Sequence, residues 1–168
     1  MFEATLLTFV GAAAIAGAAY DLTTLTIPNW ISLILLVLFP VLALAAGMSL
    51  NEAGIHFAVG AGALIVGITL FAGGIVGGGD AKLFAAMALY MGVQSIGPYV
   101  FAVALAGGVL ALALLLLRSL PARIFPSRLW WTHKATDQGA GIPYGVAIAA
   151  GGLCVFPATH LFALAAGH

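Results

Sequence analysis

Long apolar runs separated by short breaks constrain the fold of this chain more than any other feature. Hydrophobic side chains make up 64% of its 168 residues, and charged side chains make up only 6%. A globular domain normally carries about 25% charged residues, so this chain cannot cover itself with a solvated surface. We therefore predict an integral membrane protein that forms a single domain over residues 1–168.

Six of the runs come near the roughly 20 apolar residues that a membrane-spanning helix needs. Glycine, proline and asparagine stand between them, and the runs lack the alternating pattern of an outer-membrane barrel. We expect the first run to be a helix and not a signal peptide, because no basic region precedes it and no cleavage site follows it. The sequence predicts an all-α bundle with spans at residues 4–20, 30–48, 54–73, 81–96, 97–117 and 143–165.

The basic residues predict the orientation of this bundle. With six spans, the connections at residues 21–29, 74–80 and 118–142 share one side of the membrane. Glu3 and Glu52 lie toward the other side. All the basic residues lie in or beside these three connections: Lys82, Arg118, Arg123, Arg128 and Lys134. The positive-inside rule makes the basic side cytoplasmic and places both termini outside. The same alternation brings Asp21, Asp80 and Asp137 to the cytoplasmic side.

Asp80 is the residue that most strongly indicates a function. A carboxylate beside the hydrocarbon region is costly and is by default a functional-site candidate. Asp21, at the end of the first run, is its candidate partner. Two carboxylates that share a site do not both ionise easily, so one can activate a water while the other, protonated, polarises a carbonyl. The preceding Gly77-Gly78-Gly79 would give backbone freedom and room for a substrate backbone.

Other interpretations of the two aspartates remain open at this point. Asp80 could be the N-cap of the fourth helix, and Asp21 could be a loop residue after the first. Paired acids also serve transporters or channel subunits that bind cations or protons, although we find no internal repeat of the kind common in transporters. A structural assembly factor of a secretion platform is a third class, in which Asp80 would be dispensable.

Three motifs, in order along the chain, resemble one family. They are Asp21 followed by Ile27-Pro28-Asn29, then Gly77-Gly78-Gly79-Asp80-Ala81-Lys82, and finally Ile142-Pro143-Tyr144-Gly145-Val146-Ala147. The second fits the Gly-x-Gly-Asp pattern of membrane aspartic proteases, and the set is similar to the type IV prepilin peptidase family. The resemblance implies catalysis by Asp21 and Asp80, with cleavage of a prepilin leader just before the pilin's hydrophobic segment. It also implies a bacterial inner membrane location and work beside the pilus assembly machinery.

The chain departs from the larger members of that family. They carry a cytoplasmic insertion with paired cysteines and also N-methylate the new pilin terminus. This chain has one cysteine, Cys154, so we expect no methyltransferase activity. It resembles the minimal form that serves tight-adherence (Flp-type) pili. An archaeal preflagellin peptidase is a near neighbour that the motifs do not separate.

Several residues beside the motifs are candidates for supporting roles. Lys82 could anchor the helix at the membrane surface, tune the pair of acids, or bind an acidic group of the substrate. Pro143 and Tyr144 could line a substrate groove or simply start the last helix. The supporting set is Gly77, Gly78, Gly79, Lys82, Pro28, Asn29, Pro143 and Tyr144.

The remaining polar residues predict neither a metal nor a cofactor. A lone cysteine cannot form a disulfide within the chain or a cysteine zinc cluster. The histidines are scattered, with His133 in the last polar loop and the others toward the outer side: His56, His160 and His168. Trp130 and Trp131 beside basic residues favour an anchor on the lipid surface. The net charge of zero gives no basic surface for nucleic acid.

Overall fold

The computed structural model describes residues 2–119 and 141–167, and the regular structure in both ranges is entirely helical. The all-α prediction is therefore confirmed. The first range holds α1 (Phe2–Thr24), α2 (Asn29–Ala45), α3 (Leu50–Ala72) and α4 (Gly78–Ser119). The second holds α6 (Tyr144–Val155), the short 3₁₀ helix η2 (Phe156–Ala158) and α7 (His160–Ala166).

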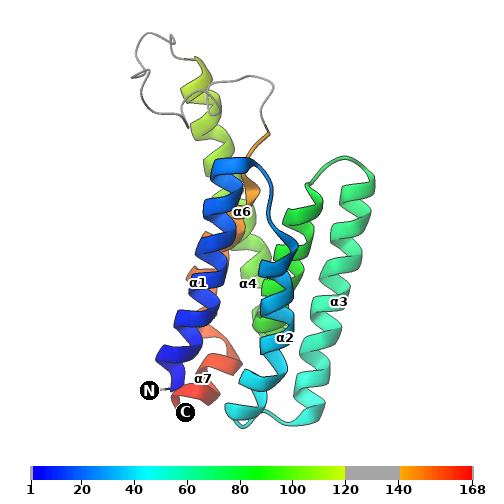
Figure 1. Cartoon of the computed structure of the whole chain (residues 1–168), viewed down its shortest axis with the longest axis vertical. Helices are drawn as coiled ribbons and strands as arrows, with labels where there is room; N and C mark the ends of the chain where they lie inside the picture. The colour runs from blue at the N-terminus through cyan, green and yellow to red at the C-terminus, as the bar shows by residue number, and fades with distance from the viewer. Residues whose placement is uncertain (1, 120–140, 168) are drawn as a thin grey trace.

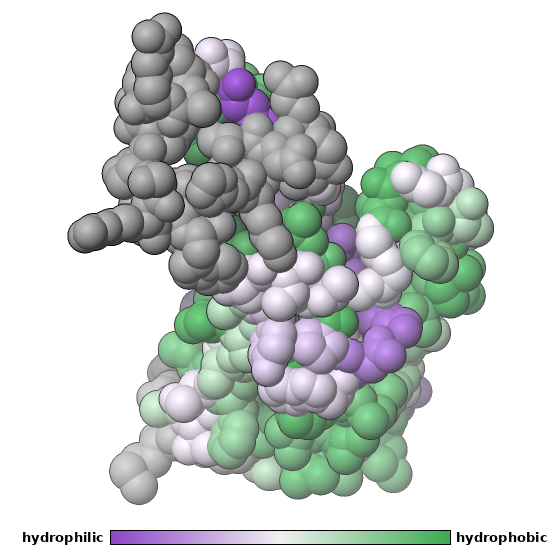
Figure 2. Space-filling model, turned by 45° about the horizontal axis from the view of Figure 1, so that its top comes forward, coloured by the Kyte–Doolittle hydropathy of each residue, from purple (hydrophilic) through white to green (hydrophobic). Residues whose placement is uncertain are grey.

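The helices have the length and polarity of a membrane bundle. Three of those described, α1, α3 and α4, are long and apolar enough to cross a membrane. The segment from α6 to α7, bent by 52°, adds a fourth when it is counted as one span, while α2 is apolar but shorter. In the space-filling view the flanks are mostly hydrophobic, and hydrophilic side chains gather toward one end (Figure 2). A polytopic helical membrane protein is thus confirmed, whereas the count of six spans stays a prediction.

α4 folds back on itself at Gly92. This residue has φ 65° and ψ −177°, a conformation that in practice only glycine adopts. The two arms of the helix then run side by side, as shown by the stacked rings of Phe84 and Tyr99, whose centroids are 4.9 Å apart. The helix continues through Pro98. The break between the fourth and fifth predicted segments therefore lies at Gly92, and not between residues 96 and 97.

The connections alternate between the two ends of the molecule. Both termini lie at one end, and the connections from α1 to α2 and from α3 to α4 lie at the other (Figure 1). Arg118, at the end of α4, reaches the backbone oxygen of Gly141 at 3.4 Å, which brings the start of the α6 segment to this second end. We call it the connection end. The connections at residues 21–29 and 74–80 lie at the same end, as predicted, whereas most of the third, at residues 118–142, lies outside the described residues. The compartment that this end faces stays a prediction.

The core forms where α2, α4 and α6 with its continuation meet. Phe39 packs edge-on against Tyr90, whose hydroxyl donates to the backbone oxygen of Leu35 at 2.7 Å. Phe156 packs against the same tyrosine. This buried hydroxyl needs a partner because the bilayer offers no water to replace one.

Glycine allows close helix packing at some positions. A Cβ on Gly67 would lie 2.9 Å from Ala81 Cβ, and one on Gly151 would lie 2.7 Å from the backbone nitrogen of Val103. Gly62 and Gly108, in contrast, face open space, so a side chain there would meet no neighbouring helix. Some residues discussed above lie outside the described ranges: Arg123, Arg128, Trp130, Trp131, His133, Lys134, Asp137 and His168.

Candidate active site

Asp21 lies inside α1 and not in a loop. The helix runs on to Thr24, so the aspartate sits in its last turns, with only 4% of its surface exposed. Its Oδ2 accepts a hydrogen bond of 2.6 Å from the backbone N–H of Gly145, the second residue of α6. The first N–H groups of a helix have no partner within the helix and favour an anionic one. The interpretation of Asp21 as an ordinary loop residue is wrong.

Asp80 is the third residue of α4, which begins at Gly78 and not after the aspartate. It is therefore not the N-cap, which corrects the structural interpretation of this residue. Its half-buried carboxylate reaches back, and Oδ2 accepts a hydrogen bond of 3.2 Å from the N–H of Gly77. This is the reciprocal half of a capping box. Oδ1 is buried and has no hydrogen-bond partner among the described residues, so it can still accept one from a ligand or water.

The two aspartates belong to the same end of the bundle, close to the connection between α1 and α2. Ile27, in the connection between α1 and α2, is packed between α4, which carries Asp80, and α6, whose Gly145 binds Asp21. A Cβ on Gly79 would lie 3.0 Å from Ile27 Cβ and 3.2 Å from its backbone nitrogen and oxygen. A Cβ on Gly145 would lie 2.9 Å from both Ile27 Cδ1 and Asp21 Oδ2. The spacing of the two acids thus depends on contacts that only glycine allows.

The run of glycines before Asp80 serves close approach and not unusual backbone angles. None of Gly77, Gly78 and Gly79 has a positive φ, so the prediction that they provide backbone freedom is wrong. Instead each lies against a neighbour. A Cβ on Gly77 would lie 2.6 Å from Asp80 Oδ2, and one on Gly78 would lie 3.3 Å from the ring of Phe71. With the contact of Gly79 on Ile27, the three glycines fit the start of α4 into a tight space.

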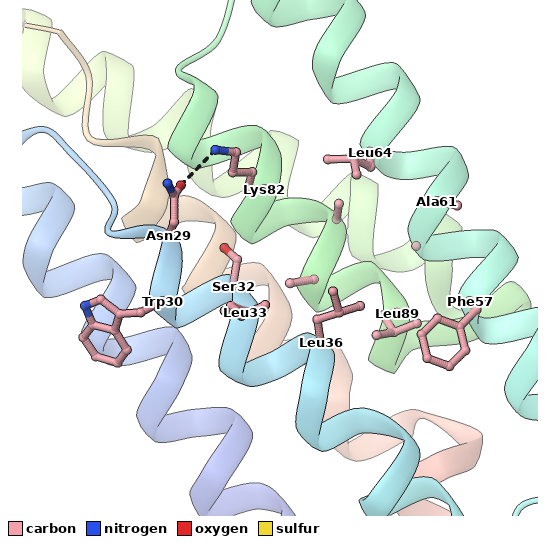
Figure 3. Close-up of a pocket in the computed structure, with 13 residues that line it drawn as sticks. Asn29, Trp30, Ser32, Leu33, Leu36, Phe57, Ala61, Leu64, Lys82 and Leu89 are labelled. Carbon is pink, nitrogen blue, oxygen red and sulfur yellow. Dashed lines mark hydrogen bonds between the residues drawn. The ribbon is translucent and has the colours of Figure 1, made fainter.

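Lys82 and Asn29 are joined by a direct hydrogen bond. The Nζ of Lys82 donates to Asn29 Oδ1 at 2.9 Å and so ties the start of α2 to the first turns of α4 (Figure 3). Pro28 is the N-cap residue of α2. These three predicted residues therefore lie next to the connection that carries Ile27.

Pro143 and Tyr144 start α6, as one of their two predicted interpretations requires. Pro143 is the buried N-cap residue, and Tyr144 is the first residue of the helix. The tyrosine ring lies against α4, since a Cβ on Gly107 would be 3.1 Å from its Cε1. The structure thus gives Tyr144 a packing role between α6 and the second arm of α4.

Two members of the site have no predicted role in the sequence analysis, the N–H of Gly145 and the side chain of Ile27. Both lie within the motifs quoted there, beside Tyr144 and Pro28. The motifs were therefore the available signal, but no spacing rule pairs a backbone N–H with a carboxylate 124 residues away. Within residues 2–119 and 141–167, no three His, Cys, Asp or Glu side chains gather as metal ligands would.

The arrangement defines a class of protein: a helical membrane protein with two carboxylates at one end, one of them with a free buried oxygen. A comparison with protein families matches residues 8–112, more than half of the chain, to the type IV leader peptidase family. The chain belongs to this family and is a peptidase. The match includes Asp21, Asp80 and the Ile27-Pro28-Asn29 motif, whereas Gly145 lies beyond it. Comparisons with curated proteins and with solved structures find no significant match.

Proposed function

We propose that this protein is an aspartic endopeptidase that removes the leader peptide of type IV prepilins of the Flp type at the cytoplasmic face of the bacterial inner membrane. Asp21 and Asp80 are its catalytic residues. The observation that supports this best is the free, buried Oδ1 of Asp80, at the same end of the bundle as Asp21. Family membership favours proteolysis over a transporter or an assembly factor.

The chemistry follows from two carboxylates that hold one proton between them. The ionised carboxylate takes a proton from a water, whose oxygen attacks the carbonyl carbon of the scissile bond. The protonated carboxylate donates a hydrogen bond to the carbonyl oxygen. When the tetrahedral intermediate collapses, the C–N bond breaks and the leaving nitrogen takes a proton from a carboxyl group. General acid–base catalysis of this kind contributes about 10²–10⁴-fold.

The lone Cys154 supports the minimal subtype. The paired cysteines of the larger enzymes have no counterpart in this chain, which has a single cysteine. We therefore assign leader cleavage without N-methylation. Mass spectrometry of the processed pilin should show an unmodified N-terminus, and a methylated terminus produced by this protein alone would contradict the subtype.

Single aspartate substitutions test the proposed function. We expect Asp21→Asn and Asp80→Asn each to abolish cleavage of a co-expressed Flp-type prepilin, because each removes one ionisable carboxyl from the pair. The loss should be at least about 10³-fold. Cleavage is measured as a mobility shift of the pilin, beside the amount of peptidase in the membrane.

Asp137→Asn is the matched control, since it makes the same change in the third aspartate of the chain. It should leave cleavage unchanged. Normal processing by either the Asp21 or the Asp80 variant would overturn the assignment of the pair. Normal processing by both would favour a structural role for the protein.

A further inference from the structure

An apolar cavity lies beside the candidate site and plays no part in the chemistry described so far. Its volume is about 540 Å³, and α2, α3 and the first arm of α4 form its walls (Figure 3). Large apolar side chains line it from all three helices: Leu33, Leu36, Phe57, Leu64 and Leu89. α2 packs mainly on α4 and hardly on α3, which leaves the space between α2 and α3 open.

One end of this cavity is polar and is formed by Asn29, Ser32 and Lys82. Lys82 already donates to Asn29, yet no carboxylate of the described residues forms an ion pair with it. The hydroxyl oxygen of Ser32 is buried and has no hydrogen-bond partner within the described ranges. A buried polar atom without a partner is costly, so this hydroxyl indicates a ligand with polar atoms at this end of the cavity.

The polar end of the cavity lies next to the connection that contacts the candidate active site. Asn29, at this end, follows Ile27 by two residues, and Ile27 lies against Gly79, directly before Asp80. From Lys82 the cavity follows α4 past Ala85 and Ala86 to Leu89. A peptide that leaves Asp80 beside this connection is therefore near the polar end of the cavity. The cavity is also lined by alanines at positions 61, 85 and 86, whose small side chains leave space in it. Small residues of this kind let another helix approach closely in a membrane.

We propose that this cavity binds the apolar segment of the substrate that follows the scissile bond. The inference rests on the proposed function and adds a location for the substrate. The segment lies in the cavity as a helix, because a backbone in the bilayer must satisfy its own hydrogen bonds. Polar atoms at the start of the segment face Lys82 and Ser32. A lipid acyl chain would also suit the apolar walls, but nothing would align it with Asp80.

Photocrosslinking tests the location directly. The photoreactive residue p-benzoylphenylalanine replaces Leu36, which lines the cavity, or Val37, its lipid-facing neighbour on α2, which does not. The two side chains are 45% and 59% exposed, so both positions tolerate the probe. Both proteins also carry Asp80→Asn, which keeps a co-expressed Flp-type prepilin uncleaved.

We expect a crosslink to the apolar segment of the prepilin from position 36 and none from position 37. Equal crosslinking from both positions would overturn the proposal. So would a crosslink from position 36 to phospholipid alone, which would identify the cavity as a lipid site.

A filled cavity tests the same proposal through kinetics. Ala61→Phe places a ring in the cavity, and Ala58→Phe makes the same change at an exposed position of α3 outside it. We expect Ala61→Phe to raise the KM for full-length prepilin about tenfold, while Ala58→Phe leaves it unchanged. A short peptide that spans the cleavage site but lacks the apolar segment should be cleaved equally by both variants.

This design separates two kinds of failure. If the unsubstituted protein cleaves neither the prepilin nor the short peptide, the proposed function fails and this inference falls with it. If the unsubstituted protein cleaves the prepilin and Ala61→Phe does so equally well, only the cavity assignment fails. A similar loss with Ala61→Phe on both substrates would show damage to the site itself and would also overturn the assignment.

Discussion

Gly145 holds Asp21 through its backbone, and its missing side chain leaves the room for this contact. A Cβ there would lie 2.9 Å from both Cβ and Oδ2 of Asp21. We therefore expect Gly145→Ala to displace the carboxylate and lower kcat for leader cleavage by about 100-fold, the loss that a misplacement of 1 Å can cause. The measurement is single-turnover cleavage of an Flp-type prepilin in detergent.

Gly108→Ala is the control for this prediction. Gly108 is also helical, but a Cβ there has no heavy atom within 4 Å. Both variants should insert and express alike. Full activity of Gly145→Ala would mean that the hydrogen bond to Asp21 has no influence on catalysis.

Gly79 makes the corresponding contact on the other side of Ile27. The atoms that a side chain would meet include the backbone nitrogen and oxygen of Ile27 at 3.2 Å, and backbone cannot rotate away. We expect Gly79→Val to disable cleavage and Gly79→Ala to lower it at least about tenfold, with little change in expression. Gly62→Ala, at an open position of α3, should have no effect in the same mobility-shift assay. An active Gly79→Val protein would show that Ile27 does not set the spacing of the acids.

At the residue scale, the sequence predicted which acids to consider but not how they are held. The cost of a carboxylate beside hydrocarbon identified Asp80, and the alternation of the spans brought Asp21 to the same side. The hydrogen bond from Gly145 to Asp21 and the contacts of Ile27 with Gly79 and Gly145 depend on the relative placement of three helices. Local patterns carry no information on such placement, so these contacts could not be predicted.

Among the elements, the reversal of α4 at Gly92 depends on His56 of α3. Nδ1 of His56 donates to the backbone oxygen of Leu89 at 2.8 Å and so satisfies a carbonyl beside the break. The ring also stacks on Phe39, with centroids 5.5 Å apart. The buried histidine thus has a role in helix packing.

Substitution of Gly92 should therefore destabilise the fold more than that of any helical glycine at an open position. A Cβ there would lie 2.5 Å from Cε1 and Nε2 of His56, and the backbone conformation strongly disfavours other residues. We expect Gly92→Ala to cost about 2–4 kcal/mol of unfolding free energy, seen as a lower Tm in detergent. Gly97→Ala, on the same helix with nothing within 4 Å, should leave Tm unchanged or raise it.

A double-mutant cycle separates the two contributions. His56→Ala removes the steric contact but also leaves the oxygen of Leu89 without its partner, at a cost of about 1–3 kcal/mol. In the double variant the losses should be less than additive, because the clash is absent. Strict additivity would mean that the ring does not oppose a side chain at position 92.

At the element scale, helix type was predictable and helix ends were not. Apolar runs predict every helix of the described residues, but α1 extends past Asp21 to Thr24, and α4 begins at Gly78 and not after Asp80. Polar and glycine residues predict breaks because they usually end helices in water. Here the carboxylates are buried against neighbouring helices, and tertiary contacts stabilise helical turns that local propensity disfavours.

For the whole molecule, the alternation of charge along the chain predicted which connections lie together. Lys82 and Arg118 lie toward the connection end, whereas Glu52 lies at the other end, paired with His160 at 3.5 Å. This grouping needs only the number of reversals between charged residues, so it survives errors of several residues in the helix ends. It does not require the contacts within the bundle to be known.

The compartment that each end faces is open to a direct test. In a Cys154→Ser background, Ile75→Cys places a thiol at the connection end, and Asn51→Cys places one at the opposite end. Both positions are exposed, so both thiols are accessible to a reagent. The positive-inside rule predicts that a membrane-impermeant maleimide labels the cysteine at position 51 in intact spheroplasts, and the one at position 75 only after lysis. The reverse pattern would place the candidate active site outside the cytoplasm, where the proposed leader cleavage could not take place.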